Sequence, residues 1–154
     1  MSAKVFQRFL SSGGPLSSLL HCGGGVQSSV PQLFHRYCAP IISEIVDVRD
    51  DAHYREELHS AKEAKRLVVL NFTAEWCMPC KLMAPALEAK SVERKDIRFL
   101  RLDLDSQPLA SIIKSFQIAS VPTFTFIKEG KVVDSFVGAS AKMLDDYITE
   151  WGDK

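Results

Sequence analysis

The chain has 154 residues, a length that fits one ordinary domain or a smaller domain with an appendage. Its hydrophobic residues, 46%, and its charged residues, 25%, are both near the average for globular proteins. Its 19 basic and 19 acidic residues balance, which gives no support for nucleic-acid binding, and no run of 18 apolar residues is present for a transmembrane helix. We therefore expect neither a nucleic-acid partner nor a membrane span. Four cysteines are also too few for a small domain held together by disulfides.

Residues 1–43 differ in composition from the rest of the chain. They contain no acidic residue, but they hold eight serines and five of the eight glycines. Near the start, apolar side chains recur on one helical face beside two basic ones: Val5, Phe6, Phe9, Leu10, Lys4 and Arg8. A basic amphipathic helix of this kind is typical of organellar transit peptides. We therefore expect residues 1–38 to be a disordered transit peptide that is cleaved off.

The N-terminal segment favours the mitochondrial matrix as the destination. Arg36, followed by Tyr37 and Cys38, resembles a mitochondrial processing site and would leave a domain of residues 39–154. A plastid remains an alternative, because plastid addresses have a similar composition. The apolar run at 15–20 is interrupted by two serines, which argues against a secretory signal. Neither Cys22 nor Cys38 is assigned a function.

Beyond Glu44, predicted strands and helices alternate. Apolar runs and period-two alternation indicate strands, whereas capping residues and apolar positions at helical spacing indicate helices. The predicted strands are 43–48, 67–73, 97–104, 123–127 and 132–137, and the predicted helices are 51–65, 79–95, 108–116 and 141–151. The run at 67–73 is almost entirely apolar, as in a central strand buried on both faces. Residues 128–131 join the last two strands as a hairpin with Gly130 in the turn.

This order of elements predicts the fold class. Strands joined through helices favour parallel pairing, whereas the final hairpin requires antiparallel pairing. We expect an α/β fold in which a central mixed β-sheet is flanked by α-helices on both faces.

Two cysteines stand three residues apart where the strand at 67–73 gives way to a helix. On the first helical turn, the sulfurs of Cys77 and Cys80 lie close enough to form a disulfide. The N–H groups of the helix start favour the thiolate of Cys77, which is the nucleophile in thiol–disulfide exchange. Cys80 would then resolve the mixed disulfide. The motif therefore predicts a redox site.

Other uses of a cysteine pair with this spacing remain open. A zinc site needs two further ligands, and the four histidines all precede the motif without finger spacing. An iron–sulfur cluster shared between two chains is a second alternative. A buried structural pair is a third, which Pro79 and Trp76 disfavour. We expect no metal.

The residues around this pair resemble the thioredoxin family. The sequence WCMPCK follows FTAE, Val121-Pro122-Thr123 comes later, and Phe136-Val137-Gly138 stands near the end. The match covers nearly all of 44–154. The resemblance implies the thioredoxin fold and the reduction of protein disulfides, and the presequence makes the chain similar to mitochondrial thioredoxins.

The resemblance also implies roles for the residues next to the cysteines. Cys77 would be the exposed nucleophile and Cys80 the buried resolving thiol. Trp76 would pack beside the disulfide and shape the docking surface. Met78 and Pro79 stand between the cysteines and belong to the same site.

Three positions farther along the chain would complete the docking surface. The resemblance implies that a cis peptide bond precedes Pro122 and that this proline faces the disulfide. The Val121 backbone would then be free to pair with an extended substrate strand. Gly138 would keep the surface low, and Pro85 would kink the active-site helix.

Two positions depart from the family pattern. Asn71 replaces a buried Asp that the family usually has six residues before the first cysteine, and Arg101 aligns with the usual Lys partner of that Asp. Because an amide cannot accept a proton, we hypothesise that proton removal from Cys80 is slow. Met78 replaces the usual Gly, and it enlarges the apolar surface without the charge that makes a disulfide oxidising.

The family also implies how electrons reach the site. No cofactor would be bound, because an NADPH-dependent flavin thioredoxin reductase would supply the electrons. Disulfide-containing proteins such as peroxiredoxins would receive them from a monomeric protein. A disulfide isomerase or oxidase on the same fold, or a redox-gated binding module, is the alternative function.

Overall fold

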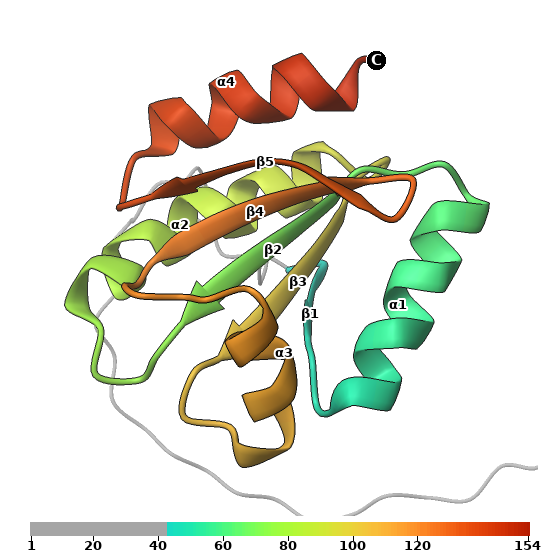
Figure 1. Cartoon of the computed structure of the whole chain (residues 1–154). Helices are drawn as coiled ribbons and strands as arrows, with labels where there is room; N and C mark the ends of the chain where they lie inside the picture. Colours follow the sequence, from blue (N-terminus) through green and yellow to red (C-terminus); the bar gives the residue numbers. More distant parts are fainter. Residues whose placement is uncertain (1–42) are drawn as a thin grey trace, which may run out of the picture. The chain divides into compact units, whose positions relative to one another are not determined.

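A computed structural model describes residues 43–154 of the protein (Figure 1). The strands are β1 Ile45–Asp47, β2 Val68–Thr73, β3 Arg98–Asp103, β4 Thr123–Lys128 and β5 Lys131–Val137, and the helices are α1 Asp51–Glu63, α2 Met78–Glu93, α3 Ala110–Ser115 and α4 Ala141–Gly152. Within this part of the chain, no helix combines the length and the apolar character needed to cross a membrane. The predicted transit peptide, its cleavage site, Cys22 and Cys38 lie outside the described residues.

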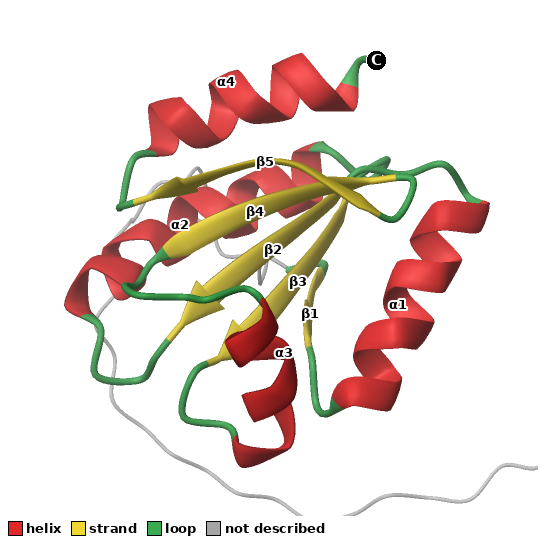
Figure 2. Cartoon of the chain, viewed as in Figure 1, coloured by secondary structure: helices red, strands yellow, loops and turns green. Residues whose placement is uncertain are grey.

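The five strands form one mixed sheet in the order β1-β3-β2-β4-β5 (Figure 2). β3 pairs in parallel with both β1 and β2, whereas β4 pairs antiparallel with β2 and with β5. The parallel pairs are joined through helices, and β4 and β5 form a hairpin. The predicted strand pairing is confirmed.

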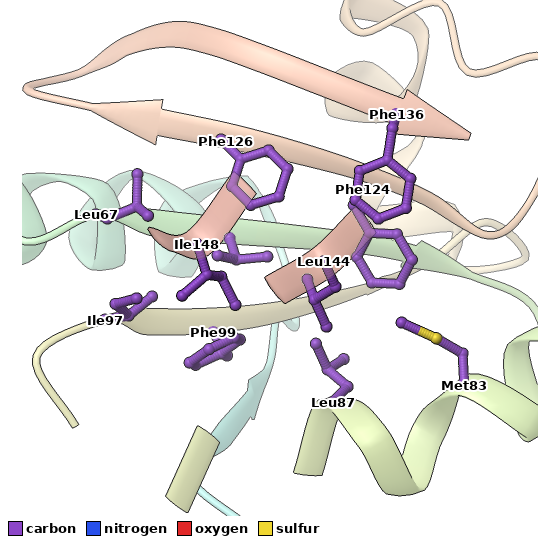
Figure 3. Packing of buried hydrophobic residues seen from close by; sticks show 11 residues of the cluster. Leu67, Met83, Leu87, Ile97, Phe99, Phe124, Phe126, Phe136, Leu144 and Ile148 are labelled. Carbon is purple, nitrogen blue, oxygen red and sulfur yellow. The ribbon is translucent and has the colours of Figure 1, made fainter. Parts of the chain in front are cut away.

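Helices cover both faces of the sheet, as expected. On one face, α2 and α4 pack through Met83, Leu87, Leu144 and Ile148 against a layer of strand side chains that includes Phe124 (Figure 3). On the other face, side chains of α1 and of the segment containing α3 pack against β2 and β3; among them are Ala61, Leu109 and Ile112. β2 lies in the middle of both layers, and every residue of it except the last is buried.

The helices begin at capping residues and differ slightly in extent from the predictions. The Asp50 side chain caps α1, and the Ser140 side chain caps α4. α1 ends at Glu63 rather than 65, because Lys65 takes a left-handed conformation with φ of 54°. The predicted helix at 108–116 is a 3₁₀ turn, Gln107–Leu109, followed by a short α3.

The two edges of the sheet are irregular. β1 has only three residues, and at the opposite edge the pairing of β5 with β4 shifts register between Phe126 and Ile127. β5 also carries Lys131 and Asp134. Neither edge therefore presents a long, regular, uncharged strand.

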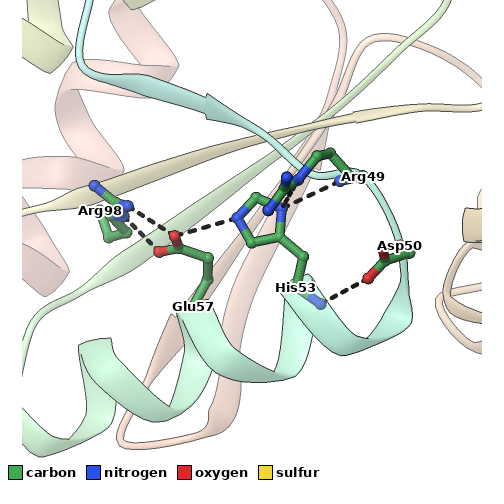
Figure 4. Close-up of polar contacts among 5 residues, drawn as sticks. All are labelled: Arg49, Asp50, His53, Glu57 and Arg98. Carbon is green, nitrogen blue, oxygen red and sulfur yellow. Dashed lines mark hydrogen bonds and ion pairs between the residues drawn. The ribbon is translucent and has the colours of Figure 1, made fainter.

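A polar network holds α1 to the sheet (Figure 4). The Arg98 guanidinium on β3 donates two hydrogen bonds, of 2.7 and 2.8 Å, to the Glu57 carboxylate on α1. These bonds hold the pKa of Glu57 below its usual range. The Nε2 atom of His53 lies 3.5 Å from the same carboxylate, and its Nδ1 accepts from the Arg49 backbone and side chain. The network therefore ties the helix to the sheet through a charged carboxylate.

We predict that Glu57→Gln lowers the free energy of unfolding at pH 7 by about 1 kcal/mol, because it removes one partner of a half-buried ion pair. A depressed pKa in the folded state means that this stabilisation is present above the unfolded pKa, ~4.3 for glutamate, and is lost at lower pH. Urea unfolding at pH 7 and pH 3 measures both effects.

Asp146→Asn is the matched control. It removes the exposed pair in which Lys142 Nζ lies 2.6 Å from the Asp146 carboxylate, and we expect no change in stability. An equal loss for Glu57→Gln at the two pH values would contradict the assigned role of the Glu57 carboxylate.

Candidate active site

The two motif cysteines lie where β2 ends and α2 begins. The β2–α2 turn is closed by a hydrogen bond of 3.1 Å from the Cys77 N–H to the Ala74 carbonyl. Cys77 is the N-cap of α2, and Pro79 lies within the first turn, where its missing N–H costs no helical hydrogen bond. β2 is held by its neighbours on both sides, so the start of α2 is fixed against the end of the sheet.

Cys77 and Cys80 form a disulfide, as the spacing predicts, and their Cα atoms are 5.3 Å apart. The Cys80 N–H donates a hydrogen bond of 3.2 Å to Cys77 Sγ. In the reduced protein, the same donor and the positive end of α2 stabilise negative charge on the Cys77 sulfur. The geometry therefore favours the first cysteine as the nucleophile.

Cys77 is less accessible than expected. Only 3% of the residue is exposed, compared with 8% for Cys80, so the expectation that Cys77 is the exposed member of the pair is wrong in the disulfide form. The two cysteines and Ala74 form a small buried cluster, against which Leu104 and Val121 pack. These apolar neighbours and the bond between the two sulfurs leave little of Cys77 in contact with water.

Apolar side chains beside the disulfide are exposed instead. Trp76, Met78 and Leu82 are 69%, 64% and 75% exposed, respectively. Met78 and Leu82 are four residues apart on α2, so they lie on the same face of that helix. We define these three residues as the apolar rim. The exposure of Trp76 favours its predicted place in a docking surface over close packing on the disulfide.

The loop before β4 reaches the same site. The peptide bond between Val121 and Pro122 is cis, as the resemblance implied, and the Val121 side chain packs against the cysteine cluster. The Gly138 N–H donates a hydrogen bond of 2.9 Å to the Pro122 carbonyl, which holds the end of β5 against this loop. The predicted docking residues Val121, Pro122 and Gly138 are therefore brought together.

Gly138 has a backbone requirement in addition to the predicted one. A Cβ atom on this residue would meet nothing within 4 Å, so the space itself would admit a side chain. Its φ of 113° is a conformation that other residues rarely adopt. The backbone conformation favours glycine here, and the expected role of Gly138 in keeping the docking surface low stays a prediction.

Asn71 lies on the middle of β2 in a buried position, and its Oδ1 atom has no hydrogen-bond partner. Arg101 is its neighbour in the β2–β3 register. The guanidinium is directed elsewhere, however, because Arg101 Nη1 lies 3.3 Å from the Asp47 carboxylate on β1. Arg101 is therefore not an ionic partner of position 71, and Asn71 presents an unsatisfied acceptor to the interior.

Sequence reasoning did not identify two residues that contribute to the site. Leu104 follows β3 and packs against the cysteine cluster, and Leu82 extends the apolar rim. Leu82 could have been found from the sequence, because it stands four residues after Met78 and therefore, in a helix, on the same face. Within residues 43–154, no three His, Cys, Asp or Glu side chains gather into a potential metal site.

Comparison with known proteins agrees with this geometry. A family model described as thioredoxin matches residues 45–150. The chain is 39% identical to thioredoxin H1 of Arabidopsis thaliana over 97 residues, which is 63% of this chain and 83% of that protein. It is 36% identical over 107 residues, 70% of this chain, to the TPR repeat-containing thioredoxin TDX of the same species, of which it spans only 28%.

Solved structures show the same fold. Thioredoxin NaTrxh from Nicotiana alata aligns with a TM-score of 0.67 at 31% identity, over 71% of this chain and 94% of that one. A chain from a structural study of thiol resolution in yeast mitochondrial 1-Cys peroxiredoxin by the glutathione and thioredoxin systems aligns with a TM-score of 0.62 at 27% identity, over 70% of this chain and 98% of that one. The predicted thioredoxin fold is confirmed.

We predict that Asn71→Asp accelerates the resolving step about tenfold, because a carboxylate at this position can accept the proton of the Cys80 thiol. The same change should lower the free energy of unfolding at pH 7 by ~1–3 kcal/mol, because Arg101 is already paired with Asp47 and the buried charge lacks a partner. Single-turnover reduction of a protein disulfide and urea unfolding measure the two effects.

Asn71→Leu is the control, since it removes the amide without supplying a base. Its resolving rate should not rise. If Asn71→Asp leaves the rate unchanged or lower, the absence of a carboxylate at position 71 does not limit the reaction.

Proposed function

The chain belongs to the thioredoxin family and is a thiol–disulfide reductase with the redox pair Cys77–Cys80, and from this premise we propose that it reduces protein disulfides with electrons from an NADPH-dependent thioredoxin reductase. The observation that carries the proposal is the cysteine pair at the start of α2, with Cys77 Sγ accepting a hydrogen bond from the Cys80 N–H. Members of this family typically bind no cofactor, so the reductase contributes the flavin.

Reduction proceeds in two exchanges at this pair. The Cys77 thiolate attacks one sulfur of the target disulfide, a mixed disulfide forms, and the other target sulfur leaves as a thiolate. Cys80, after losing its proton, attacks Cys77 Sγ, which forms the Cys77–Cys80 disulfide and releases the second target sulfur. The target gains two electrons and two protons, and the protein becomes the disulfide form described above.

The docking surface supports a protein substrate. Val121 lies just before β4 and outside its ladder, so its backbone groups can pair with an extended segment of the target. The apolar rim lies beside the disulfide and can bury apolar side chains of that segment. Such a surface binds the backbone without requiring one sequence.

The residues between the cysteines favour a reductant. Met78 and Pro79 carry no charge, whereas a cationic neighbour would stabilise the reduced thiolate and make the disulfide oxidising. Peroxiredoxins are the proposed recipients, and the similarity to a chain from a structural study of a yeast mitochondrial peroxiredoxin supports this choice. We propose that the protein acts as a monomer.

We further propose that residues 1–38 direct the chain to the mitochondrial matrix. Their acid-free, serine-rich composition and the pattern around Arg36 support this address. Import of the radiolabelled full chain into isolated mitochondria, with plastids in parallel, tests it. Processing near Cys38 in mitochondria alone is expected, whereas import only by plastids would overturn the matrix assignment.

The function is tested by NADPH-coupled reduction of insulin by the full chain and a thioredoxin reductase. We predict multiple turnovers for the native chain and a complete loss for Cys77→Ser, because that variant lacks the nucleophile. Cys80→Ser should instead accumulate a mixed disulfide with the target, which mass spectrometry under non-reducing conditions detects. Cys22→Ser with Cys38→Ser is the control for the remaining cysteines and should keep full activity.

The reduction potential distinguishes the competing roles on this fold. A reduction potential of about −270 mV is expected for a reductant, whereas about −180 to −120 mV would indicate an isomerase or an oxidase. Target binding that survives replacement of both Cys77 and Cys80, with no turnover in the native chain, would indicate a binding module and contradict the proposal.

A further inference from the structure

The sulfur-bearing side chains of residues 43–154 differ widely in exposure. Met78 is 64% exposed and Met143 is 37% exposed, whereas Met83, Cys80 and Cys77 are 4%, 8% and 3% exposed. Met78 is also the residue that follows the nucleophile and lies in the apolar rim. We propose that Met78 is a site of oxidation to methionine sulfoxide by hydroperoxides, and that this modification weakens the docking of protein substrates. The docking effect rests on the proposed function.

The chemistry needs only the hydroperoxide and the thioether. The Met78 sulfur attacks the terminal oxygen of the peroxide, the O–O bond breaks, and an S–O bond forms. The sulfur loses two electrons, the peroxide is reduced, and water leaves when the oxidant is hydrogen peroxide. A proton moves from the attacked oxygen to the leaving oxygen, so the step is balanced.

In the disulfide form, Met78 is the active-site sulfur that a peroxide can reach. Peroxides react with cysteine thiolates, but in this form both active-site sulfurs are bonded to each other and buried. Met83 faces the core on the other side of α2. Met78 is therefore the accessible sulfur at the active site as long as the Cys77–Cys80 disulfide has not been reduced.

Oxidation changes the character of the docking surface. Met78 shares one helix face with Leu82, and only Cys77 separates it from Trp76 in the sequence. A sulfoxide oxygen is a strong hydrogen-bond acceptor, and an apolar target side chain that covers it must remove its water without offering a donor. Oxidation therefore lowers the affinity for those targets whose side chains cover the apolar rim.

The reactive pair itself is left intact by this change. The bond from the Cys80 N–H to Cys77 Sγ involves no Met78 side-chain atom. A small disulfide such as 5,5′-dithiobis(2-nitrobenzoate) can reach Cys77 without covering the rim. We therefore expect oxidation to reduce activity on protein disulfides much more than activity on the small disulfide.

The test treats the full chain in its disulfide form with hydrogen peroxide, in a background carrying Cys22→Ser and Cys38→Ser. Peptide mass spectrometry follows the gain of one oxygen at each methionine. We expect Met78 to oxidise several-fold faster than Met143, with Met83 protected. The kcat/KM for insulin should then fall about tenfold, equivalent to about 1.4 kcal/mol, with less than twofold change for the small disulfide.

Two variants test whether oxidation of Met78 causes the loss of activity on insulin. Each treated protein is compared with its own untreated sample: Met78→Leu should resist the peroxide-dependent loss, and Met143→Leu should lose activity as the parent does. Treatment with a methionine sulfoxide reductase should restore the parent. Equal oxidation of Met78 and Met143, or an equal loss in Met78→Leu, would overturn the proposal.

The outcomes also separate this inference from the proposed function. If the untreated protein fails to reduce insulin, the proposed function fails, whichever methionine is oxidised. If the untreated protein is active and its Met78 sulfoxide form is equally active, only the inference about docking fails.

Discussion

The start of α2 is the constraint on which the rest of the site depends. Cys77 must cap this helix while it still belongs to the turn that leaves β2, so the position of this cysteine is set by the strand and by the helix together. β2 is buried between β3 and β4 and covered on both faces, which leaves it little freedom to shift. The packing of the central strand therefore determines where the Cys77 sulfur lies.

The same helix serves both the core and the redox site. Met83 and Leu87 on α2 join the core layer shared with α4, whereas Met78 and Leu82 point to solvent. Burial of the inner face holds the outer face in place, so the apolar rim is presented by a rigid element rather than by a loop. This arrangement allows exposed apolar side chains to persist next to the disulfide without collapsing onto it.

Local sequence patterns predicted most of this architecture because the deciding interactions are local. The apolar run of β2, the glycine turn before β5 and the cysteine spacing each determine their own segment. The cis bond before Pro122 came from the resemblance, since no local pattern indicates it. These features together placed the site at the end of β2.

What sequence reasoning missed depends on contacts between distant segments. The direction of the Arg101 side chain toward Asp47 follows from the β1–β3 pairing, which no local pattern reveals. The burial of Cys77 follows from Leu104 and Val121, which come from two other parts of the chain. The backbone angle that favours glycine at 138 is also not indicated by any local pattern.

The irregular edges of the sheet have a consequence for how this protein meets other strands. A long, flat, uncharged edge strand is a template for amyloid-like growth between copies. A three-residue β1 offers almost no template, and the register shift and the charges at Lys131 and Asp134 make β5 a poor one. The main-chain pairing proposed for Val121 is then the favoured route for a foreign strand, and it lies beside the disulfide, where such a strand can be reduced and released instead of accumulating in an aggregate.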